Sequence, residues 1–303
     1  MYSDKDYSLY DGIPKEFKFI RNKEFNDWEI PPWDIIIHRD TLIGNGEHGN
    51  VYLAKWKETQ VVVKVMSQHI EPEKKHLFIN EFDTLSKAHH PNIVQLLGYI
   101  EDPFIIIMEY LPSFNLLHYI QHNILSIDEK INVCLDILKG IDYLHSRKPQ
   151  SMIHRDIKPQ NIILNESKKA KIGDFGLCKL FNTHLHKTPS SENLIKTISS
   201  EDLTNHVGTR RYMSPEIIKQ SSYNHKIDIW SLGIMFAELF ENRRYNEEFF
   251  WKKTPQNIQQ IIIQHMLREN PSDRLKANEI IQIFKCVQNE RKLNVTHCSC
   301  MIC

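Results

Sequence analysis

The feature that most constrains the fold of this chain is a change in the spacing of its apolar residues near residue 111. Before that point the apolar runs are short and rich in β-branched side chains, which is typical of strands. After it, apolar residues recur about every 3.6 positions, the period of a helix. We therefore expect an α+β chain with a strand-rich first part and a longer, mainly helical second part. The expected strands are residues 34–38, 49–55, 61–66, 93–100 and 104–110.

One helix is expected within the strand-rich part, at residues 72–89, where Leu77, Glu81 and Leu85 fall on the same face. Lys64 lies in an apolar strand. A charged side chain on a buried face needs an opposite charge, so we expect Lys64 to pair with Glu81. The alternatives are a lysine whose ammonium reaches solvent and a solvated helix glutamate.

Composition excludes several classes of protein. The chain has 303 residues, with 38 basic and 38 acidic side chains, so no net charge directs it to nucleic acid or to an anionic membrane. No apolar run approaches the roughly 20 residues of a membrane-spanning helix, and no signal peptide is visible. Six cysteines form no disulfide framework. We expect a cytoplasmic protein.

Glycine is scarce, with 10 in 303 residues against an average usage of about 7%. Three of the ten, Gly44, Gly46 and Gly49, form a G-x-G-x-x-G-x-V pattern with Val51 between two expected strands. Glycines let backbone amides approach phosphate closely. A dinucleotide-binding fold would place a helix after this pattern, whereas a strand follows here. A glycine-rich hairpin without a ligand remains the alternative.

Two further motifs are more specific. Residues 154–161 read H-R-D-I-K-P-Q-N, and residues 173–176 read G-D-F-G. At these residues the chain resembles eukaryotic protein kinases, in which both motifs occur in this order. The resemblance implies that Asp156 orients or accepts the substrate proton, that Lys158 neutralises the transferred phosphoryl group, and that Asn161 and Asp174 hold Mg²⁺.

The same resemblance extends over most of the chain. Residues 208–216 resemble the end of a kinase activation segment and include Thr209. Glu216 is expected to pair with Arg274, and Asp228 to anchor the backbone of the catalytic loop. The implied fold has two lobes, a small antiparallel sheet with one helix and a larger helical lobe. The expected divisions are an extension at 1–30, the N-lobe at 31–111, the C-lobe at 112–292 with an activation segment at 174–216, and a tail at 293–303.

The resemblance also implies an ATP site. Lys64 and Glu81 belong to its catalytic apparatus, and Asn115 occupies the position that usually contacts the ribose. The hinge exit departs from the family pattern, because Pro112, Ser113 and the bulky Phe114 stand where small residues, often including a glycine, are common. The expected nucleotide-binding residues are Ile43, Gly44, Asn45, Gly46, Glu47, His48, Gly49, Asn50, Val51, Val62, Lys64, Met108, Glu109, Leu111, Asn115 and Ile163.

Lys158 and Thr209 are the residue types that serine/threonine kinases carry at these positions. The sequences of residues 51–57, 82–85 and 90–98 resemble those of the tyrosine-kinase-like branch. We expect transfer of the γ-phosphoryl group of Mg-ATP to serine or threonine of protein substrates, with dual specificity left open. Arg155 and the Ser/Thr-rich residues 188–204 suggest regulation by activation-segment phosphorylation. The spacing between Glu238 and Arg274 is about a dozen residues shorter than expected for such kinases, so a substrate-docking helix is expected to be truncated.

Two questions stay open at this level. The second class of function is a kinase-fold scaffold that binds nucleotide or partners without turnover. The five side chains that distinguish an active kinase from such a scaffold are all present: Lys64, Glu81, Asp156, Asn161 and Asp174. The C-terminal residues 298–303 can be read as a lipidation motif with Cys300 prenylated, as a metal clip, or as an unmodified tail.

Overall fold

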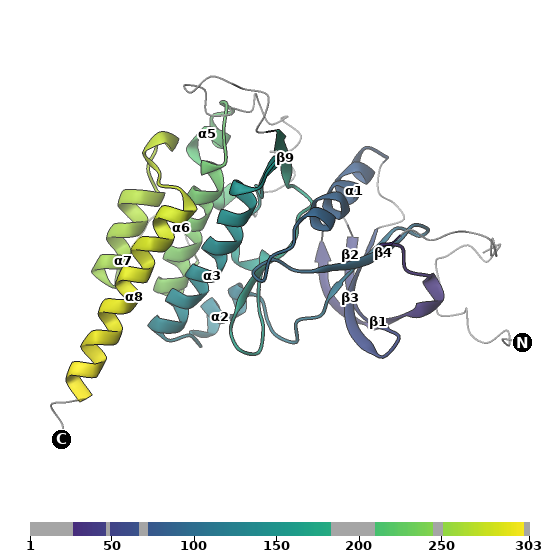
Figure 1. Cartoon of the computed structure of the whole chain (residues 1–303), viewed down its shortest axis with the longest axis horizontal. Coiled ribbons are helices and arrows are strands. Elements are labelled where there is room, and N and C mark those ends of the chain that lie inside the picture. The colour runs from purple at the N-terminus through teal and green to yellow at the C-terminus, as the bar shows by residue number, and fades with distance from the viewer. Residues whose placement is uncertain (1–26, 47–48, 67–71, 183–209, 245–250, 300–303) are drawn as a thin grey trace, which may run out of the picture. The chain divides into compact units, whose positions relative to one another are not determined.

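The computed structural model describes residues 27–46, 49–66, 72–182, 210–244 and 251–299. The chain divides into two compact units (Figure 1). The first comprises Met1–Lys87 and Gln95–Tyr110, and the second comprises Ala88–Val94 and Leu111–Cys303. The chain therefore enters the second unit briefly at Ala88, returns to the first, and leaves it again after Tyr110.

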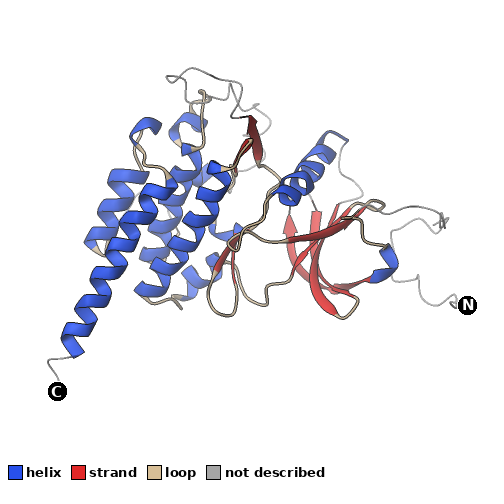
Figure 2. Cartoon of the chain, in the orientation of Figure 1, coloured by secondary structure: helices blue, strands red, loops and turns tan. Residues whose placement is uncertain are grey.

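The first unit is a five-stranded antiparallel sheet in the order β1-β2-β3-β5-β4, accompanied by one helix, α1 (Figure 2). Its core comes from the inward-facing positions of the strands, including the fully buried Ala54, Val61, Val63 and Ile107. Buried and half-buried residues alternate along Leu96–Ile100, which follows from the two-residue period of a strand. The elements are β1 (Ile35–Gly46), β2 (Gly49–Trp56), β3 (Thr59–Met66), α1 (Pro72–Lys87), β4 (Leu96–Ile100) and β5 (Ile105–Glu109).

The second unit is mainly helical, with short strands paired as β6-β9 and β7-β8. A three-residue 3-10 turn occupies Arg210–Tyr212, and a π-helical turn at Ile262–Met266 follows α7. The elements are α2 (Leu116–His122), α3 (Ile127–Ser146), β6 (Gln150–Ile153), β7 (Ile162–Leu164), β8 (Ala170–Ile172), β9 (Lys179–Asn182), α5 (Pro215–Ile218), α6 (Lys226–Glu241), α7 (Gln256–Ile261) and α8 (Ala277–Ser299). Helix α8 runs through the first part of the segment set apart above as a tail.

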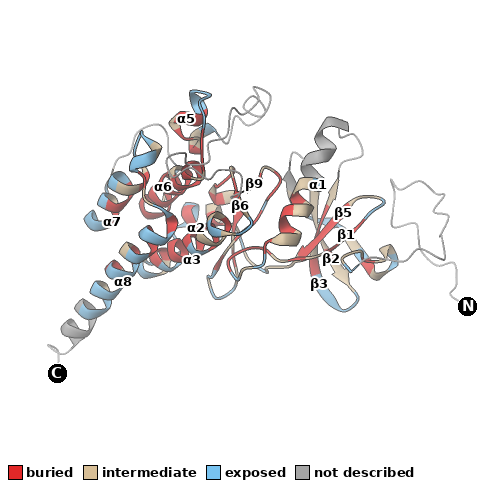
Figure 3. Cartoon of the chain, turned by 45° about the horizontal axis from the view of Figure 1, so that its top comes forward, coloured by how far each residue is buried: buried red, intermediate tan, exposed pale blue. Residues whose placement is uncertain are grey.

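Helix α6 lies at the centre of the second unit and is buried around nearly its whole circumference (Figure 3). A helix that is apolar on all sides is stable only when other elements cover it. Helix α3 buries one side instead, and Ser126 and Glu129 form a capping box that fixes its start. The polar side chains on α6 are consequently few and buried, which makes each of them a candidate for a specific role.

The expected fold class is confirmed: an antiparallel five-stranded sheet with one helix precedes a mainly helical region. Two expected strands differ. The strand expected at residues 34–38 continues to Gly46 as β1. Residues 93–94 do not join the sheet, because the Val94 N–H donates to the carbonyl of Ile172 and the Ile172 N–H donates to the carbonyl of Asn92. These bonds tie residues 92–94 to β8 in the second unit, and β4 begins only at Leu96. None of the described helices combines the length and apolarity that crossing a membrane requires.

Candidate active site

The glycine pattern forms a β-hairpin between β1 and β2, with Gly44 opposite Val51, Asn45 opposite Asn50 and Gly46 opposite Gly49. A Cβ added to Gly49 would lie 2.4 Å from the carbonyl oxygen of Val65 in β3, so only glycine permits this approach of the two strands. The hairpin agrees with the expectation of a strand after the glycines. The tip residues Glu47 and His48 lie outside the described residues.

Lys64 and Glu81 form the predicted ion pair. The Lys64 ammonium lies 2.6 Å from Oε2 of Glu81, and both residues are buried, with relative exposures of 5% and 1%. Lys64 is fixed by its register in β3, opposite Val51 on one side and Ile106 on the other. Burial makes each charge depend on the other. A solvated glutamate and a snorkelling lysine are thereby excluded.

The other expected nucleotide-binding residues are divided between the two units. In the first unit Val62 stands opposite Met108 across the β3–β5 pair, and Ile43 on β1 is 52% exposed. The Glu109 carboxylate accepts a hydrogen bond from the Gln95 backbone at 2.7 Å. Leu111, Asn115 and Ile163 belong to the second unit.

Asn115 has a structural role that the expectation did not include. It is the N-cap of α2, and its Oδ1 accepts a hydrogen bond from the His118 N–H at 3.2 Å. The preceding Phe114 is 59% exposed and stacks on the His118 ring with centroids 4.0 Å apart. The hinge exit is therefore organised by capping and ring stacking.

The catalytic loop is held by a single carboxylate. Asp228, at the start of α6, accepts hydrogen bonds from the backbone N–H groups of His154 and Arg155, each at 2.9 Å. Nε2 of His145 donates to the same carboxylate at 2.8 Å. Burial alone would raise the pKa of Asp228, but the hydrogen bonds from His145 and His154 outweigh it and lower that pKa. The predicted anchoring of the loop by Asp228 is present.

Asp156 presents one oxygen that is engaged and one that is not. Its Oδ2 accepts hydrogen bonds from the Lys158 ammonium at 2.6 Å and from Nδ2 of Asn161 at 2.9 Å. Its Oδ1 is buried and accepts no hydrogen bond from the described residues. A buried carboxylate oxygen without a donor is costly, and it is suited to receive the hydroxyl group of a substrate.

Asn161 and Asp174 fit the expected magnesium site by their donor chemistry. Within the described part of the chain the Asn161 side chain forms its hydrogen bonds through Nδ2, so its amide oxygen is the atom left for a cation. The Gly173 N–H donates to the Asn161 carbonyl at 2.8 Å, which links the two motifs, and Asp174 is exposed. No group of three acidic, histidine or cysteine side chains in the described part of the chain could hold a metal ion. Mg²⁺ fits this pair, since it commonly takes one or two protein ligands and completes its shell with phosphate and water.

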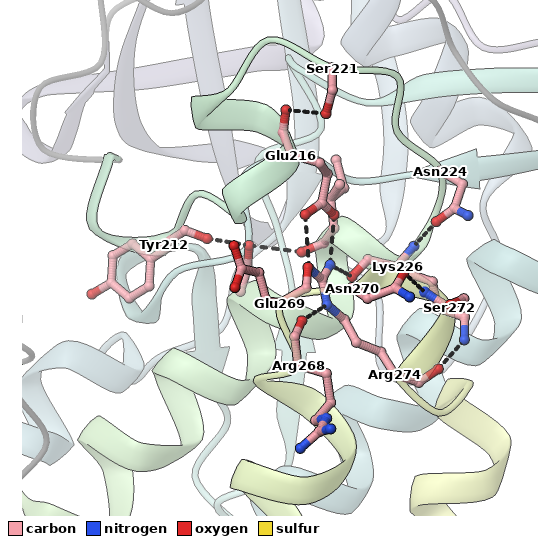
Figure 4. Close-up of polar contacts among 12 residues, drawn as sticks. Tyr212, Glu216, Ser221, Asn224, Lys226, Arg268, Glu269, Asn270, Ser272 and Arg274 are labelled. Atoms are coloured by element: carbon pink, nitrogen blue, oxygen red, sulfur yellow. Dashed lines mark hydrogen bonds and ion pairs between the residues drawn. The ribbon is translucent and has the colours of Figure 1, made fainter.

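Glu216 and Arg274 form the second predicted ion pair, shown in Figure 4. The pair is bidentate, with Nη1 of Arg274 2.6 Å from Oε1 of Glu216 and Nη2 2.8 Å from Oε2. The remaining guanidinium donors reach the backbone carbonyls of Lys226, Arg268 and Glu269. This full complement of acceptors offsets the cost of burying an arginine with 1% exposure.

Sequence reasoning missed His145 and Tyr223. His145 contacts Asp228, which lies 83 residues further along the chain, and the Tyr223 hydroxyl accepts from Arg155 across 68 residues. A single sequence carries no signal for contacts at such separations. Several predicted residues lie outside the described ranges and have no structural account: Thr209, the Ser/Thr-rich residues 188–204 and Cys300.

The fold, the glycine hairpin with the Lys64–Glu81 pair, and the loop that carries Asp156 and Asn161 are together those of a protein kinase. The protein kinase domain family matches residues 37–286. The chain belongs to this family, which confirms the sequence resemblance at the level of the family and its fold.

Comparison with curated proteins finds serine/threonine-protein kinases. The chain is 36% identical to the serine/threonine-protein kinase VIK of Arabidopsis thaliana over 222 residues. This alignment covers 71% of the chain and 48% of the relative. The kinase shk2 of Schizosaccharomyces pombe is 35% identical over 209 residues, covering 66% and 32%. STE20 of Candida glabrata is 33% identical over 248 residues, covering 80% and 24%. The chain thus spans about half or less of the length of these relatives.

Proposed function

We propose that this protein transfers the γ-phosphoryl group of ATP to serine or threonine hydroxyl groups of protein substrates. The observation that carries the proposal is the Asp156 carboxylate, whose Oδ1 is buried without a donor while Oδ2 is fixed by Lys158 and Asn161. In the reaction, the hydroxyl oxygen bonds to the γ-phosphorus, the bond from that phosphorus to the bridging oxygen breaks, and ADP leaves with the electron pair.

In this proposal Asp156 orients the substrate hydroxyl through Oδ1 and takes its proton. Asn161 holds the carboxylate in place through Oδ2 and through the Asp156 backbone carbonyl, at 2.8 Å. Lys158 contributes a positive charge 2.6 Å from Oδ2, next to the oxygen that accepts the proton. Such fixed charges favour the reaction because they need no rearrangement as it proceeds.

Asn161 and Asp174 would hold Mg²⁺, whose charge neutralises and orients the phosphates of the nucleotide when it is bound. In the first unit Lys64, paired with Glu81, supplies a further cation for the phosphates. The glycine hairpin supplies backbone N–H groups that no side chain obstructs. The inactive-scaffold alternative finds no support among these residues, since each catalytic position carries the required side chain.

The acceptor class and the branch of the family belong to the same proposal. Lys158 two positions after Asp156 resembles serine/threonine kinases, and the relatives described above are named as such kinases. The amino-acid sequences of residues 51–57 and 90–98 support placement of the chain on the tyrosine-kinase-like branch.

We also propose regulation by phosphorylation between residues 174 and 216. Arg155 supports this, because among the described residues its side chain donates only to neutral acceptors: Nε donates to the Leu177 carbonyl and Nη1 to the Tyr223 hydroxyl at 3.3 Å. Both acceptors are neutral, so a phosphate would be a stronger partner for the guanidinium. Mass spectrometry of active protein before and after phosphatase treatment tests this, and full activity of unmodified protein would contradict it.

The experiment for the acceptor class uses three matched peptides that differ only in carrying serine, threonine or tyrosine at the acceptor position. With γ-labelled ATP and Mg²⁺, label is expected in the serine and threonine peptides, and it should disappear when EDTA removes the metal. Label confined to tyrosine would overturn the acceptor class. Absence of label from all three, with intact ATP binding, would favour a scaffold.

A further inference from the structure

A cluster of arginines surrounds a buried tyrosine and glutamate pair at the start of the segment that follows residue 209. The Tyr212 hydroxyl donates to Oε2 of Glu238 at 2.8 Å, and Glu238 is 1% exposed. Nη1 of Arg211 lies 3.7 Å from Oε1 of the same carboxylate. Arg244 acts on the Tyr212 phenol through its charge and a side-chain hydrogen bond. Tyr212 and Arg211 therefore contact Glu238 directly, Arg244 reaches the same site through Tyr212, and Arg210 precedes Arg211 in the chain.

The charges of this cluster do not cancel. Burial and the neighbouring Glu238 carboxylate raise the pKa of Tyr212, so its phenol stays neutral. Glu238 contributes one negative charge, whereas Arg210, Arg211 and Arg244 contribute three positive charges. Arg210 and Arg244 are exposed, and within the described residues no carboxylate forms an ion pair with either of them. An excess of positive charge is thus presented to solvent at this place.

Helix α6 fixes the arginine cluster relative to Asp156. Asp228 at its start holds the backbone of His154 and Arg155, next to Asp156. Further along the same helix, the Ser231 hydroxyl donates to the Tyr212 carbonyl at 2.7 Å, and Glu238 receives the Tyr212 hydroxyl. Asp228 and Glu238 are about ten residues apart, or about 15 Å along the helix, a distance that about five residues of an extended peptide span.

We propose that Arg210 and Arg244 bind an anionic side chain of the protein substrate, a carboxylate or a phosphate, within about five residues of the phosphorylated serine or threonine. Guanidinium groups pair with both anions through charge-assisted hydrogen bonds. This inference rests on the proposed kinase function and specifies its substrate class. The Tyr212–Glu238 hydrogen bond and the Arg211 charge position the segment, and the two exposed arginines make the contact.

The test compares serine peptides in which one aspartate is moved through up to about five positions on either side of the acceptor. Each has a partner with asparagine at the same position, and a second series carries phosphoserine there to distinguish phosphate from carboxylate. At low ionic strength the best aspartate peptide should exceed its asparagine partner by about fivefold in kcat/KM, mainly through KM. The preference should shrink in about 0.5 M salt, where exposed charges are screened.

The variant Arg210→Gln/Arg244→Gln should bring this ratio close to one. Both side chains are exposed, so their replacement leaves the core intact. Lys285→Gln, which removes one positive charge from an exposed position of α8, is the matched control and should keep the preference. A wild-type protein without preference, or a preference that survives in the double variant, overturns the inference while leaving the kinase function standing.

If none of the peptides accepts phosphate, the proposed function fails, and the arginine cluster is then judged by binding. Fluorescence anisotropy of labelled aspartate and asparagine peptides measures it without turnover. Tighter binding of the aspartate peptide that is lost in the double variant supports the inference, and equal binding of the two peptides overturns it.

Discussion

At the residue scale, Lys64 and Glu81 bury opposite charges that neither could bury alone. Their 2.6 Å contact stabilises the first unit, and in the proposed function it also presents a cation to phosphate. These two roles can be separated, because replacing both members of a buried pair by apolar side chains of similar size is often neutral, whereas removing one member leaves a buried charge without a partner.

We expect Glu81→Leu to lower the stability of the protein by about 3–5 kcal/mol through the uncompensated Lys64. The double variant Lys64→Met/Glu81→Leu should recover most of the lost melting temperature and still transfer no phosphate. Thermal melting and label transfer, measured on the same preparations, check this. Recovery of activity in the double variant would show that Lys64 has no role in transfer.

His225 gives a prediction about pH. Burial lowers its pKa to about 3, helped by the charges of His145, Lys226 and Lys276 and opposed by Asp228. In the unfolded chain His225 binds a proton as the pH falls below about 6.5, whereas in the folded protein it stays neutral until the pH approaches 3. The contribution of His225 to stability is therefore complete above about pH 6.5 and is lost as the pH falls toward 3. The loss is up to about 1.4 kcal/mol per pH unit.

The measurement is the melting temperature at pH 7.5 and pH 5.5 for the wild type and for His225→Gln. The variant should lose less stability between the two pH values than the wild type does. His122→Gln, which changes an exposed histidine on α2, is the matched control and should follow the wild type. Identical pH dependence of wild type and His225→Gln would contradict the prediction.

At the element scale, α6 organises the second unit by what its few polar side chains hold. Asp228 holds the catalytic loop, and Ser231 and Glu238 hold the segment containing Tyr212. At its last turn, Glu241 accepts hydrogen bonds from the backbone N–H groups of residues 252, 253 and 254. This carboxylate thereby fixes the chain that leads into α7, in the region between Glu238 and Arg274 that we expect to be shorter than in related kinases.

Glu241→Gln should loosen that connection, since an amide offers one acceptor oxygen in place of two and its NH₂ group faces donors. Burial raises the pKa of Glu241, but hydrogen bonds from Thr254 and from the backbone of Lys252 outweigh it and lower that pKa. Amide hydrogen exchange should therefore accelerate at residues 252–254 in the variant. Unchanged protection there would show that other contacts hold the segment.

The ion pair between Arg274 and Glu216 ties α5 to the chain before α8 in the same unit. Arg274→Met should leave Glu216 buried without a cation and lower the melting temperature by about 6–12 °C, the equivalent of a loss of about 3 kcal/mol. Glu216→Leu/Arg274→Met should restore much of it. Differential scanning fluorimetry measures both, and a single variant as stable as the wild type would contradict the bracing role.

The elements themselves were largely readable from local patterns. β-branched runs, the helical period after residue 111 and the glycine hairpin are properties of neighbouring residues, and so is the capping position of Asn115, which could have been read from an asparagine directly before an apolar helix. What escaped prediction depends on the approach of distant segments. Residues 93–94 lie outside the five-stranded sheet because Val94 bonds to Ile172. Glu241 has its hydrogen-bond partners because residues 252–254 fold back onto α6.

At the scale of the whole molecule, the residues proposed for phosphate transfer belong to two different units. The first unit carries the glycine hairpin with the Lys64–Glu81 pair, and the second carries Asp156, Asn161 and Asp174. The ordered motifs identified the family and the expected roles, because chemistry of this kind requires fixed residue types at fixed spacings. The proposed substrate preference depends instead on Arg210, Arg211 and Arg244, and it could not be read from the motifs because Arg211 and Arg244 come together only in the fold, through Glu238 and Tyr212.

The central claim is that Asp156 accepts the substrate proton during phosphate transfer. It is tested most directly by the initial rate of label transfer from γ-labelled ATP to a serine peptide by Asp156→Asn, with Asp128→Asn, an exposed change on α3, as control. The rate should fall at least about 100-fold in Asp156→Asn, with ATP binding retained, and should be unchanged in the control. Equal rates in wild type and Asp156→Asn would contradict the account.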